Sequence, residues 1–463
     1  MPVTYEIEHL HQPDGWLSPG YLEVGDEGRI TAVSGQKTER GSVISVPGFG
    51  LPGLSNLHSH AFHRALVGRT EFVSSARTED NLWTWRKEMY QLVDRLSPDE
   101  YQAVASFAYL EMLRHGMTSV CEFHYVHHQP GGRRYDNPVE MSERMIAAAD
   151  EVGLGLTLLP VLYAHGGIGK PAEATQRRFV HSVDDFLCLV QDLWSRRKES
   201  SKLEVGMALH SLRAVSPTEV KGALEGMRTI DPAARLHIHV SETTHEVAEV
   251  EAGLGARPVQ WLLDNVELDD RWCLVHATHM DAKEIAGCAA SGAIVGICPL
   301  TEATMGDGFF PLVEYAGGGG KWGIGTDSHY CASIGEELRI LECGKRLELR
   351  RRNVLARPGG GIASHTGRTL FDQAIAGGEA ASRQGAGALV PGRRADLVMV
   401  DGNADGLLGH GPATALDAFT LGGTDNPIRD VMVGGRWTIR EGRHESEAKI
   451  RKAYVGAMAK LAA

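Results

Sequence analysis

One pattern recurs between residues 51 and 385: a short apolar run that ends in polar residues, followed by an amphipathic helical pattern. The apolar runs lie at 54–62, 118–127, 155–164, 203–215, 235–242, 272–279, 293–301 and 320–329. Strands that alternate with helices form parallel sheets, and eight such units are typical of a closed (β/α)8 barrel. We therefore predict an α/β fold with a TIM-like barrel.

Helix start signals follow several of these runs. Ser97-Pro98-Asp99-Glu100 offers Ser at the N-cap, Pro at the first helical position and Glu at the third. Ser216-Pro217-Thr218-Glu219 repeats this arrangement, and Asp281 with Glu284 is a variant of it. These signals predict helices that begin immediately after residues 97, 216 and 281.

The two chain ends have a different character from the repeats. Residues 1–50 contain short β-like pieces and turn residues, and an apolar segment at 397–400 follows the turn residues of 389–396. Segments 428–433 and 436–439 flank Gly434-Gly435, which predicts a hairpin. We predict that residues 1–50 and 389–463 form one small β-sandwich domain beside a barrel at 51–388.

Composition limits the possible partners and the compartment. The 463 residues carry a formal net charge of −12, which argues against binding to nucleic acid or anionic membranes. The seven cysteines include no Cys-x-x-Cys pair, which favours free thiols in a reducing cytoplasm over disulfides or cysteine-bound zinc. The chain shows no signal-peptide pattern, and no stretch approaches the roughly 18 apolar residues of a membrane span. We expect a cytoplasmic protein without nucleic-acid or membrane partners.

Histidines and an aspartate stand at the ends of several predicted strands. His58 and His60 are two residues apart, so both side chains point to the same face of a strand. Alone this pair is a weak signal, because two hydrogen-bonded histidines on a polar strand face would give the same pattern. His239, His276 and Asp327 end three further strands, and a closed barrel brings such ends together at its C-terminal mouth. This convergence favours a metal site.

This arrangement resembles the amidohydrolase superfamily of metal-dependent hydrolases, with HxH on the first strand, HxxE on the fifth, His on the sixth and Asp before Ser-His on the eighth. The resemblance implies four metal ligands: His58, His60, His239 and Asp327. It also implies that Glu242 shuttles protons and that His276 contacts the hydrolytic water or the developing charge. His237 is better interpreted as a packing histidine or one that supports a ligand.

The fourth strand carries no lysine at its end, where many binuclear members have a carboxylated one; Lys202 lies at its start. We therefore expect one divalent metal ion. Histidine nitrogens with one carboxylate suit Zn²⁺, while iron and manganese stay open. Such a metal lowers the pKa of a bound water. Asp327 can then accept a proton from the water, and Glu242 can deliver one to a leaving nitrogen, which releases ammonia.

Four segments resemble the formimidoylglutamate deiminase family, namely HSHAFHRA (58–65), LWTWR (82–86), EFHYVHH (122–128) and HSLRAV (210–215); segments 299–311 and 325–329 also fit. The resemblance implies hydrolysis of N-formimino-L-glutamate to N-formyl-L-glutamate in histidine degradation. Arg213 can bind a carboxylate of this small dicarboxylate with two hydrogen bonds, and His210 and Tyr125 can donate hydrogen bonds to it. Arg86 is either a second anion binder or part of a surface ion pair.

His63 departs from the family, which typically has a glutamine there that helps to hold the substrate. A histidine can still donate one hydrogen bond, but it is shorter and titratable. Another formimino or guanidino acid is therefore an alternative substrate. A purine-type ring, such as guanine or an adenosine derivative, is a second alternative, and a non-catalytic barrel that serves as a scaffold is a third. Barrels of this superfamily often dimerise, so we expect a homodimer.

Overall fold

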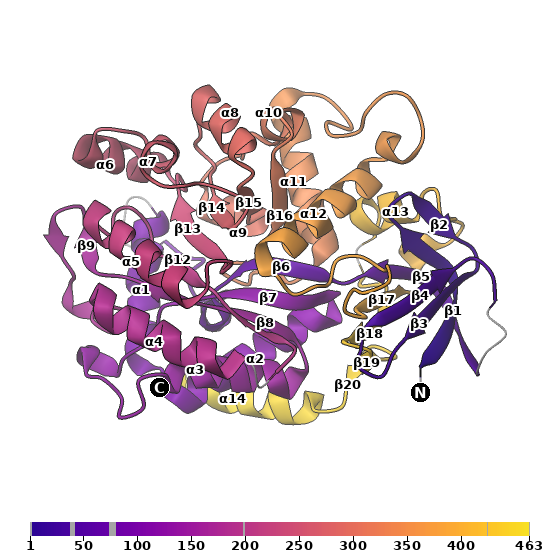
Figure 1. Cartoon of the computed structure of the whole chain (residues 1–463), viewed down its shortest axis with the longest axis horizontal. Helices are drawn as coiled ribbons and strands as arrows, with labels where there is room; N and C mark the ends of the chain where they lie inside the picture. Colours follow the sequence, from indigo (N-terminus) through magenta and orange to yellow (C-terminus); the bar gives the residue numbers. More distant parts are fainter. Residues whose placement is uncertain (1, 38–41, 74–79, 198–199, 424, 463) are drawn as a thin grey trace.

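The computed structural model describes residues 2–37, 42–73, 80–197, 200–423 and 425–462. Its larger part is a barrel of strands surrounded by helices, and a smaller sheet made from both chain ends lies beside it (Figure 1). The N-terminus lies at the smaller sheet, whereas the C-terminal helix runs back along the barrel.

Parallel strands form the barrel, and they follow one another around it in chain order. Within the described residues they are β6 (Leu54–Ser59), β7 (Met117–His124), β8 (Gly155–Leu162), β11 (Leu203–Val205), β12 (Met207–Leu209), β13 (Leu236–Val240), β14 (Trp272–His276), β15 (Ile294–Ile297) and β16 (Lys321–Ile324). A bridge between Ser59 and Asp327 joins β6 to the end of β16. The predicted barrel is confirmed, although the run at 203–215 holds two short strands followed by a loop.

The helices of the barrel cover the outside of these strands (Figure 1). In the described part of the chain they are α1 (Leu82–Arg95), α2 (Pro98–Arg114), α3 (Glu140–Val152), α4 (Val183–Arg196), α5 (Pro217–Ile230), α6 (Thr244–Leu254), α7 (Pro258–Asn265), α8 (Ala282–Ser291), α9 (Pro299–Met305), α10 (Leu312–Gly317), α11 (Ile334–Leu349) and α12 (Thr366–Ser382). The three predicted helix starts are confirmed, because Ser97, Ser216 and Asp281 cap α2, α5 and α8 through their side chains.

The barrel core follows from the composition of its strands. Every residue of β7, β8, β13 and β14 is buried, as expected for strands with side chains in the barrel on one face and helices on the other. The mouth of this core is polar, because histidines and carboxylates stand where the strands end.

The two chain ends pair in one mixed sheet, as the sequence predicts. Its strands are β1 (Val3–Gln12), β2 (Gly15–Leu17), β3 (Gly20–Val24), β4 (Ile30–Ser34), β5 (Val43–Pro52), β17 (Leu397–Val400), β18 (Ile428–Val433), β19 (Arg436–Arg440) and β20 (Arg443–His444). Strand β5 joins the two ends, since it pairs with β1 on one side and with β17 on the other. The predicted hairpin is confirmed between β18 and β19, where Gly434 and Gly435 have φ of 56° and 77°.

Two features bear on the domain boundaries at residues 50 and 389, which stay a prediction. Strand β5 runs on to Pro52, directly before β6. Helix α13 (Ala415–Leu421) packs against α12, and the C-terminal α14 (Glu447–Ala462) packs against α2, where Tyr454 stacks on Phe107 with ring centroids 4.1 Å apart. None of the described helices is long and apolar enough to cross a membrane. All seven cysteines are free.

Candidate active site

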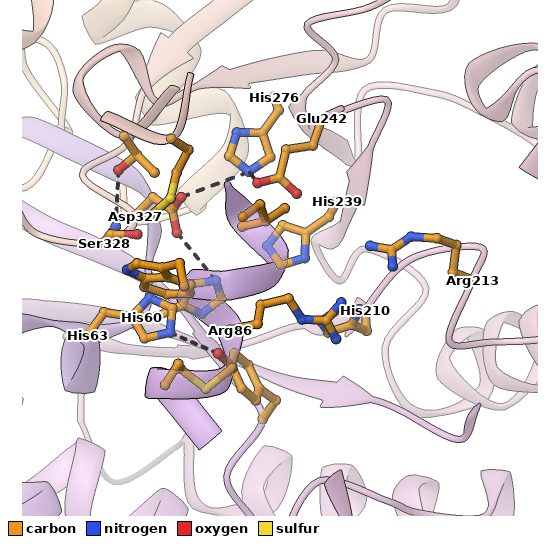
Figure 2. A pocket seen from close by; sticks show the side chains of 16 residues that line it. His60, His63, Arg86, His210, Arg213, His239, Glu242, His276, Asp327 and Ser328 are labelled. Carbon is orange, nitrogen blue, oxygen red and sulfur yellow. Dashed lines mark hydrogen bonds and ion pairs between the residues drawn. The ribbon is translucent and has the colours of Figure 1, made fainter. Parts of the chain in front are cut away.

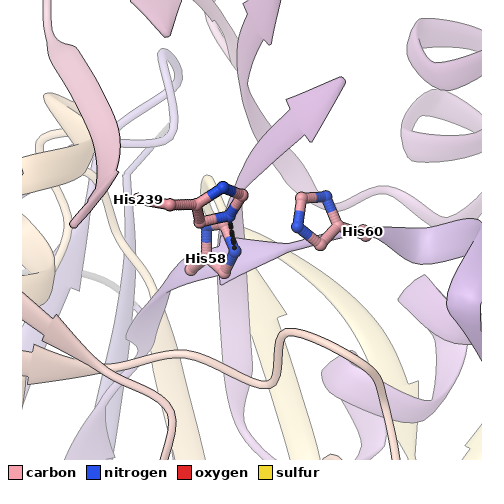
Figure 3. Close-up of side chains that lie close together, drawn as sticks. All are labelled: His58, His60 and His239. Carbon is pink, nitrogen blue, oxygen red and sulfur yellow. Dashed lines mark hydrogen bonds between the residues drawn. The ribbon is translucent and has the colours of Figure 1, made fainter. Parts of the chain in front are cut away.

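Four side chains that the sequence assigns as metal ligands meet at the barrel mouth. His58 lies on β6 and His60 directly after it, His239 lies on β13, and Asp327 follows β16. The Nε2 atoms of His58 and His239 are 3.1 Å apart (Figure 3). Asp327 Oδ1 lies 3.4 Å from His58 Nε2 and 3.5 Å from His60 Nε2. All four residues are buried or nearly so.

These separations fit ligands of one small divalent cation. Four ligands at about 2.1 Å from a tetrahedral zinc ion are about 3.4 Å from each other. Nδ1 of His60 lies 2.9 Å from the carbonyl oxygen of Phe123, so an Nδ1–H donates there and leaves Nε2 free as a ligand. Burial lowers the pKa of His58 to about 3, which keeps its ring neutral, as metal binding requires. The site thus fits the predicted cofactor, while the ligand roles stay a prediction.

The acid–base groups lie next to these ligands. Nε2 of His276 is 3.7 Å from Glu242 Oε1 and 3.9 Å from Asp327 Oδ2 (Figure 2). Burial opposes protonation of His276, but the carboxylates of Glu242, Glu302 and Asp327 outweigh it and raise its pKa to about 10. Burial raises the pKa of Glu242. It acts in the same direction on Asp327, yet the surrounding imidazoles lower that pKa overall.

One acidic residue at this site was missed by the sequence reasoning. Glu302 on α9 is buried, and its Oε1 lies 3.3 Å from His276 Nδ1. The same oxygen accepts a hydrogen bond from the backbone N–H of Cys298 at 2.9 Å. The only sequence signal for Glu302 was its place in segment 299–311, which resembles the family, but the resemblance assigned no role to any single residue of that segment.

The backbone is strained where the strands end. Asp327 and His276 have φ of 43° and 68°, and Ser241 and His329 have φ of 52° and 58°. Non-glycine residues adopt this left-handed region at a cost of about 1 kcal/mol or more each, and such residues cluster at functional sites. The strain therefore marks the turns that carry the predicted chemistry.

All five residues that the sequence predicts to bind substrate line the pocket that also contains His60, His239 and Asp327: His63, Arg86, Tyr125, His210 and Arg213. Figure 2 labels four of these five, His63, Arg86, His210 and Arg213. His63 Nε2 lies 2.9 Å from the Tyr125 hydroxyl, and burial lowers the pKa of His63 well below its ordinary value, so the ring is neutral. Sequence reasoning did not assign Trp85, Met305 and Ser328, which also line this pocket.

Arg86 faces this pocket, so its interpretation as part of a surface ion pair is wrong. Its Nη2 donates a hydrogen bond to the Tyr90 hydroxyl at 2.5 Å, and its guanidinium lies over the Trp83 ring. Arg213 also has its guanidinium over that ring. Neither arginine forms an ion pair with a carboxylate of the described residues. The pocket therefore offers two positive charges to a ligand.

The two residues that the sequence analysis considered but did not assign as metal ligands lie away from the four predicted ligands. Nε2 of His237 is 3.3 Å from the carbonyl oxygen of Ala381 on α12, in agreement with a packing role. Lys202 precedes β11 and lines a different pocket together with Arg436 and Trp437. The end of β12 leads instead to His210, which faces the candidate site.

Comparison with known proteins supports this description. The model of the amidohydrolase family matches residues 49–438. The chain is 44% identical to formimidoylglutamate deiminase of Pseudomonas aeruginosa over 97% of each chain, and 27% identical to 8-oxoguanine deaminase of the same species over 85% of this chain and 83% of that one.

Solved structures agree with these sequence relationships. The crystal structure of an amidohydrolase from Brucella melitensis matches with a TM-score of 0.91 and 38% identity over the whole of both chains. An adenosine deaminase from Xanthomonas campestris with bound zinc matches with a TM-score of 0.81 over 99% of this chain and 98% of that chain, and at 21% identity it shows the shared fold alone. This chain belongs to the amidohydrolase family.

Proposed function

We propose that the protein is a zinc-dependent deiminase that hydrolyses N-formimino-L-glutamate to N-formyl-L-glutamate and ammonia. The observation that carries the proposal is the pair Arg86 and Arg213, which face one pocket without an ion pair to a described carboxylate. A dicarboxylate would supply the two missing partners. The formimidoylglutamate deiminase of P. aeruginosa, 44% identical along nearly the whole chain, supports the same substrate.

His58, His60, His239 and Asp327 would hold one zinc ion. When bound, the metal would supply Lewis acidity and lower the pKa of water, which is the chemistry that a hydrolysis at neutral pH requires. The three imidazoles are the neutral donors of this set, and Asp327 contributes the negative charge.

The protein's own groups account for the proton transfers. Asp327, with its lowered pKa, is ionised and can accept a proton from the attacking water. Glu242, with its raised pKa, can hold a proton and deliver it to the leaving nitrogen, which departs as ammonia. The neighbouring carboxylates raise the pKa of His276, so it can carry a proton and stabilise negative charge on the oxygen that adds to the formimino carbon.

Specificity follows from the other wall of the pocket. A guanidinium can bind a carboxylate through two parallel hydrogen bonds, which a lysine cannot do. Tyr125 and His210 supply further hydrogen bonds. His63, neutral and paired with Tyr125, takes the place of the family's glutamine.

The test is ammonia release by the zinc-loaded protein, with N-formimino-L-glutamate, N-guanidino-L-glutamate, guanine and adenosine compared side by side. We expect fast turnover of the formimino acid alone. Turnover of a purine, or of the guanidino acid in preference, would contradict the substrate assignment. Metal content, measured on protein purified without added metal, distinguishes a zinc enzyme from an iron or manganese one, and protein that binds no metal and turns over no substrate would contradict the proposal.

Two further properties belong to the same proposal. The seven free cysteines fit a cytoplasmic enzyme, because a reducing compartment keeps thiols unpaired. We also propose that the protein is a homodimer, as barrels of this kind often are. Its ligand would be a small dicarboxylate, and it would bind neither nucleic acid nor membranes. Sedimentation of the purified protein tests the assembly state.

A further inference from the structure

Trp83 contacts both arginines of the candidate active site. The guanidinium carbon of Arg86 lies 4.9 Å from the centroid of its indole ring, and that of Arg213 lies 5.2 Å away. The face of an indole carries partial negative charge and attracts cations at these distances. Trp83 is therefore a shared neighbour of two cations that have no carboxylate partner among the described residues.

The local structure fixes the position of this ring. Trp83 lies in the first turn of α1, where the side-chain oxygen of Asn81 accepts a hydrogen bond from the backbone N–H of Trp83 at 3.0 Å. Trp83 and Arg86 are three residues apart, so they share one face of the helix. The ring also meets His245 at the start of α6 in an edge contact, with centroids 5.0 Å apart. Thus α1 and α6 both hold the ring.

Arg213 comes from a third segment, the loop after β12, and its Nε has no hydrogen-bond partner among the described residues. Two guanidinium groups that face one pocket without a carboxylate partner among the described residues repel each other, and each has many rotamers to lose when it binds an anion. A ring that attracts both of them offsets the cost of this repulsion and limits their rotamers before the ligand binds. Trp83 is not one of the residues that line the pocket, whereas Arg86, Arg213 and His210 are.

We propose that Trp83 is a positioning residue that holds Arg86 and Arg213 in place for the two carboxylates of the substrate. The inference rests on the proposed function, because it assumes that a dicarboxylate occupies the pocket. It assigns Trp83 no contact with the reacting atoms, so the expected effect is on binding and not on the chemical step.

The experiment compares Trp83→Leu, Trp83→Phe and the wild type. Loss of two cation–π contacts should raise KM for N-formimino-L-glutamate about tenfold or more, with kcat changed less than about threefold. Trp83→Phe keeps an aromatic face and should stay within about threefold of the wild-type KM. Trp437→Leu is the matched control, because it also removes a cation–π contact: the guanidinium carbon of Arg440 lies 4.7 Å from the centroid of the Trp437 ring. This contact is in the small sheet, so its loss should leave KM unchanged.

Calorimetric binding of glutarate, an inert dicarboxylate, separates this inference from the proposed function. If the wild type binds glutarate but does not turn over the formimino acid, the substrate assignment fails, and the glutarate affinities of the Trp83 variants still test the inference. Weaker binding in Trp83→Leu, restored in Trp83→Phe, supports it. Equal affinities in all three proteins, equal losses in both variants, or no glutarate binding by the wild type would overturn it. Circular dichroism checks that each variant is folded.

Discussion

Because of Glu122, the stability of the folded protein should fall as the pH rises from 4.5 to about 7. It lies on β7 and is fully buried. The Ser59 hydroxyl donates to its Oε2 at 2.5 Å, and the backbone N–H of Ala61 donates to its Oε1 at 2.8 Å. Burial outweighs these hydrogen bonds and raises the pKa of Glu122 from 4.5 to about 7.

The raised pKa fixes the sign of the effect. Below pH 4.5 Glu122 is protonated in both the folded and the unfolded chain, and it adds no pH dependence. Between pH 4.5 and about 7 only the unfolded chain releases the proton, so stability falls as the pH rises. The full difference is about 3 kcal/mol, because one pKa unit corresponds to about 1.4 kcal/mol. The entropy of unfolding of a chain of this size is about 1 kcal/mol/K, so this free-energy difference corresponds to a change in Tm of about 3 °C.

Glu122→Gln keeps the size of the side chain and an acceptor for the Ala61 N–H, but it cannot ionise. In metal-free protein, the Tm of this variant relative to wild type should therefore rise by about 3 °C between pH 5 and pH 8. Scanning calorimetry in the presence of a chelator measures it. Glu151→Gln is the control. Burial opposes ionisation of Glu151, but hydrogen bonds from Lys449 and Ser106, with the positive charge of Lys449, outweigh it and lower the pKa, so that group is ionised throughout this window. A Glu122→Gln offset that is the same at both pH values would refute the reasoning.

Three further substitutions test the candidate site. Asp327→Ala removes both a predicted ligand and the base, so turnover should be lost and zinc content should fall well below one ion per chain, as measured by atomic absorption; full activity would contradict both roles. Arg213→Ala should raise KM for the dicarboxylate about ten- to hundredfold with little change in kcat, and an unchanged KM would show that the substrate is misplaced. Glu302→Gln removes a charge that raises the pKa of His276, so the alkaline limb of the kcat/KM profile should move to lower pH; an unmoved limb would separate Glu302 from His276.

Most of the fold could be predicted from short, local sequence signals. The helix starts at Ser97, Ser216 and Asp281 depend on hydrogen bonds within one turn, so a short stretch of sequence contains all the information that they need. The run at 203–215 was predicted less well. There Gly206 separates β11 from β12 at a point where a Cβ atom would lie 2.6 Å from the carbonyl oxygen of Arg235. Arg235 directly precedes β13, which pairs with β12, so this close approach has no local signature in the sequence.

The same distinction explains what could be predicted of the site. His58, His60, His239 and Asp327 stand at strand ends, and barrel closure alone brings strand ends together, so recognising the barrel was enough to group them. Glu302 and Trp83 lie on helices, and their contacts depend on how α9 and α1 pack over the mouth. No periodicity encodes that packing. The supporting residues of such a site can therefore be found only from the three-dimensional structure, even where its chemistry can be inferred from the sequence.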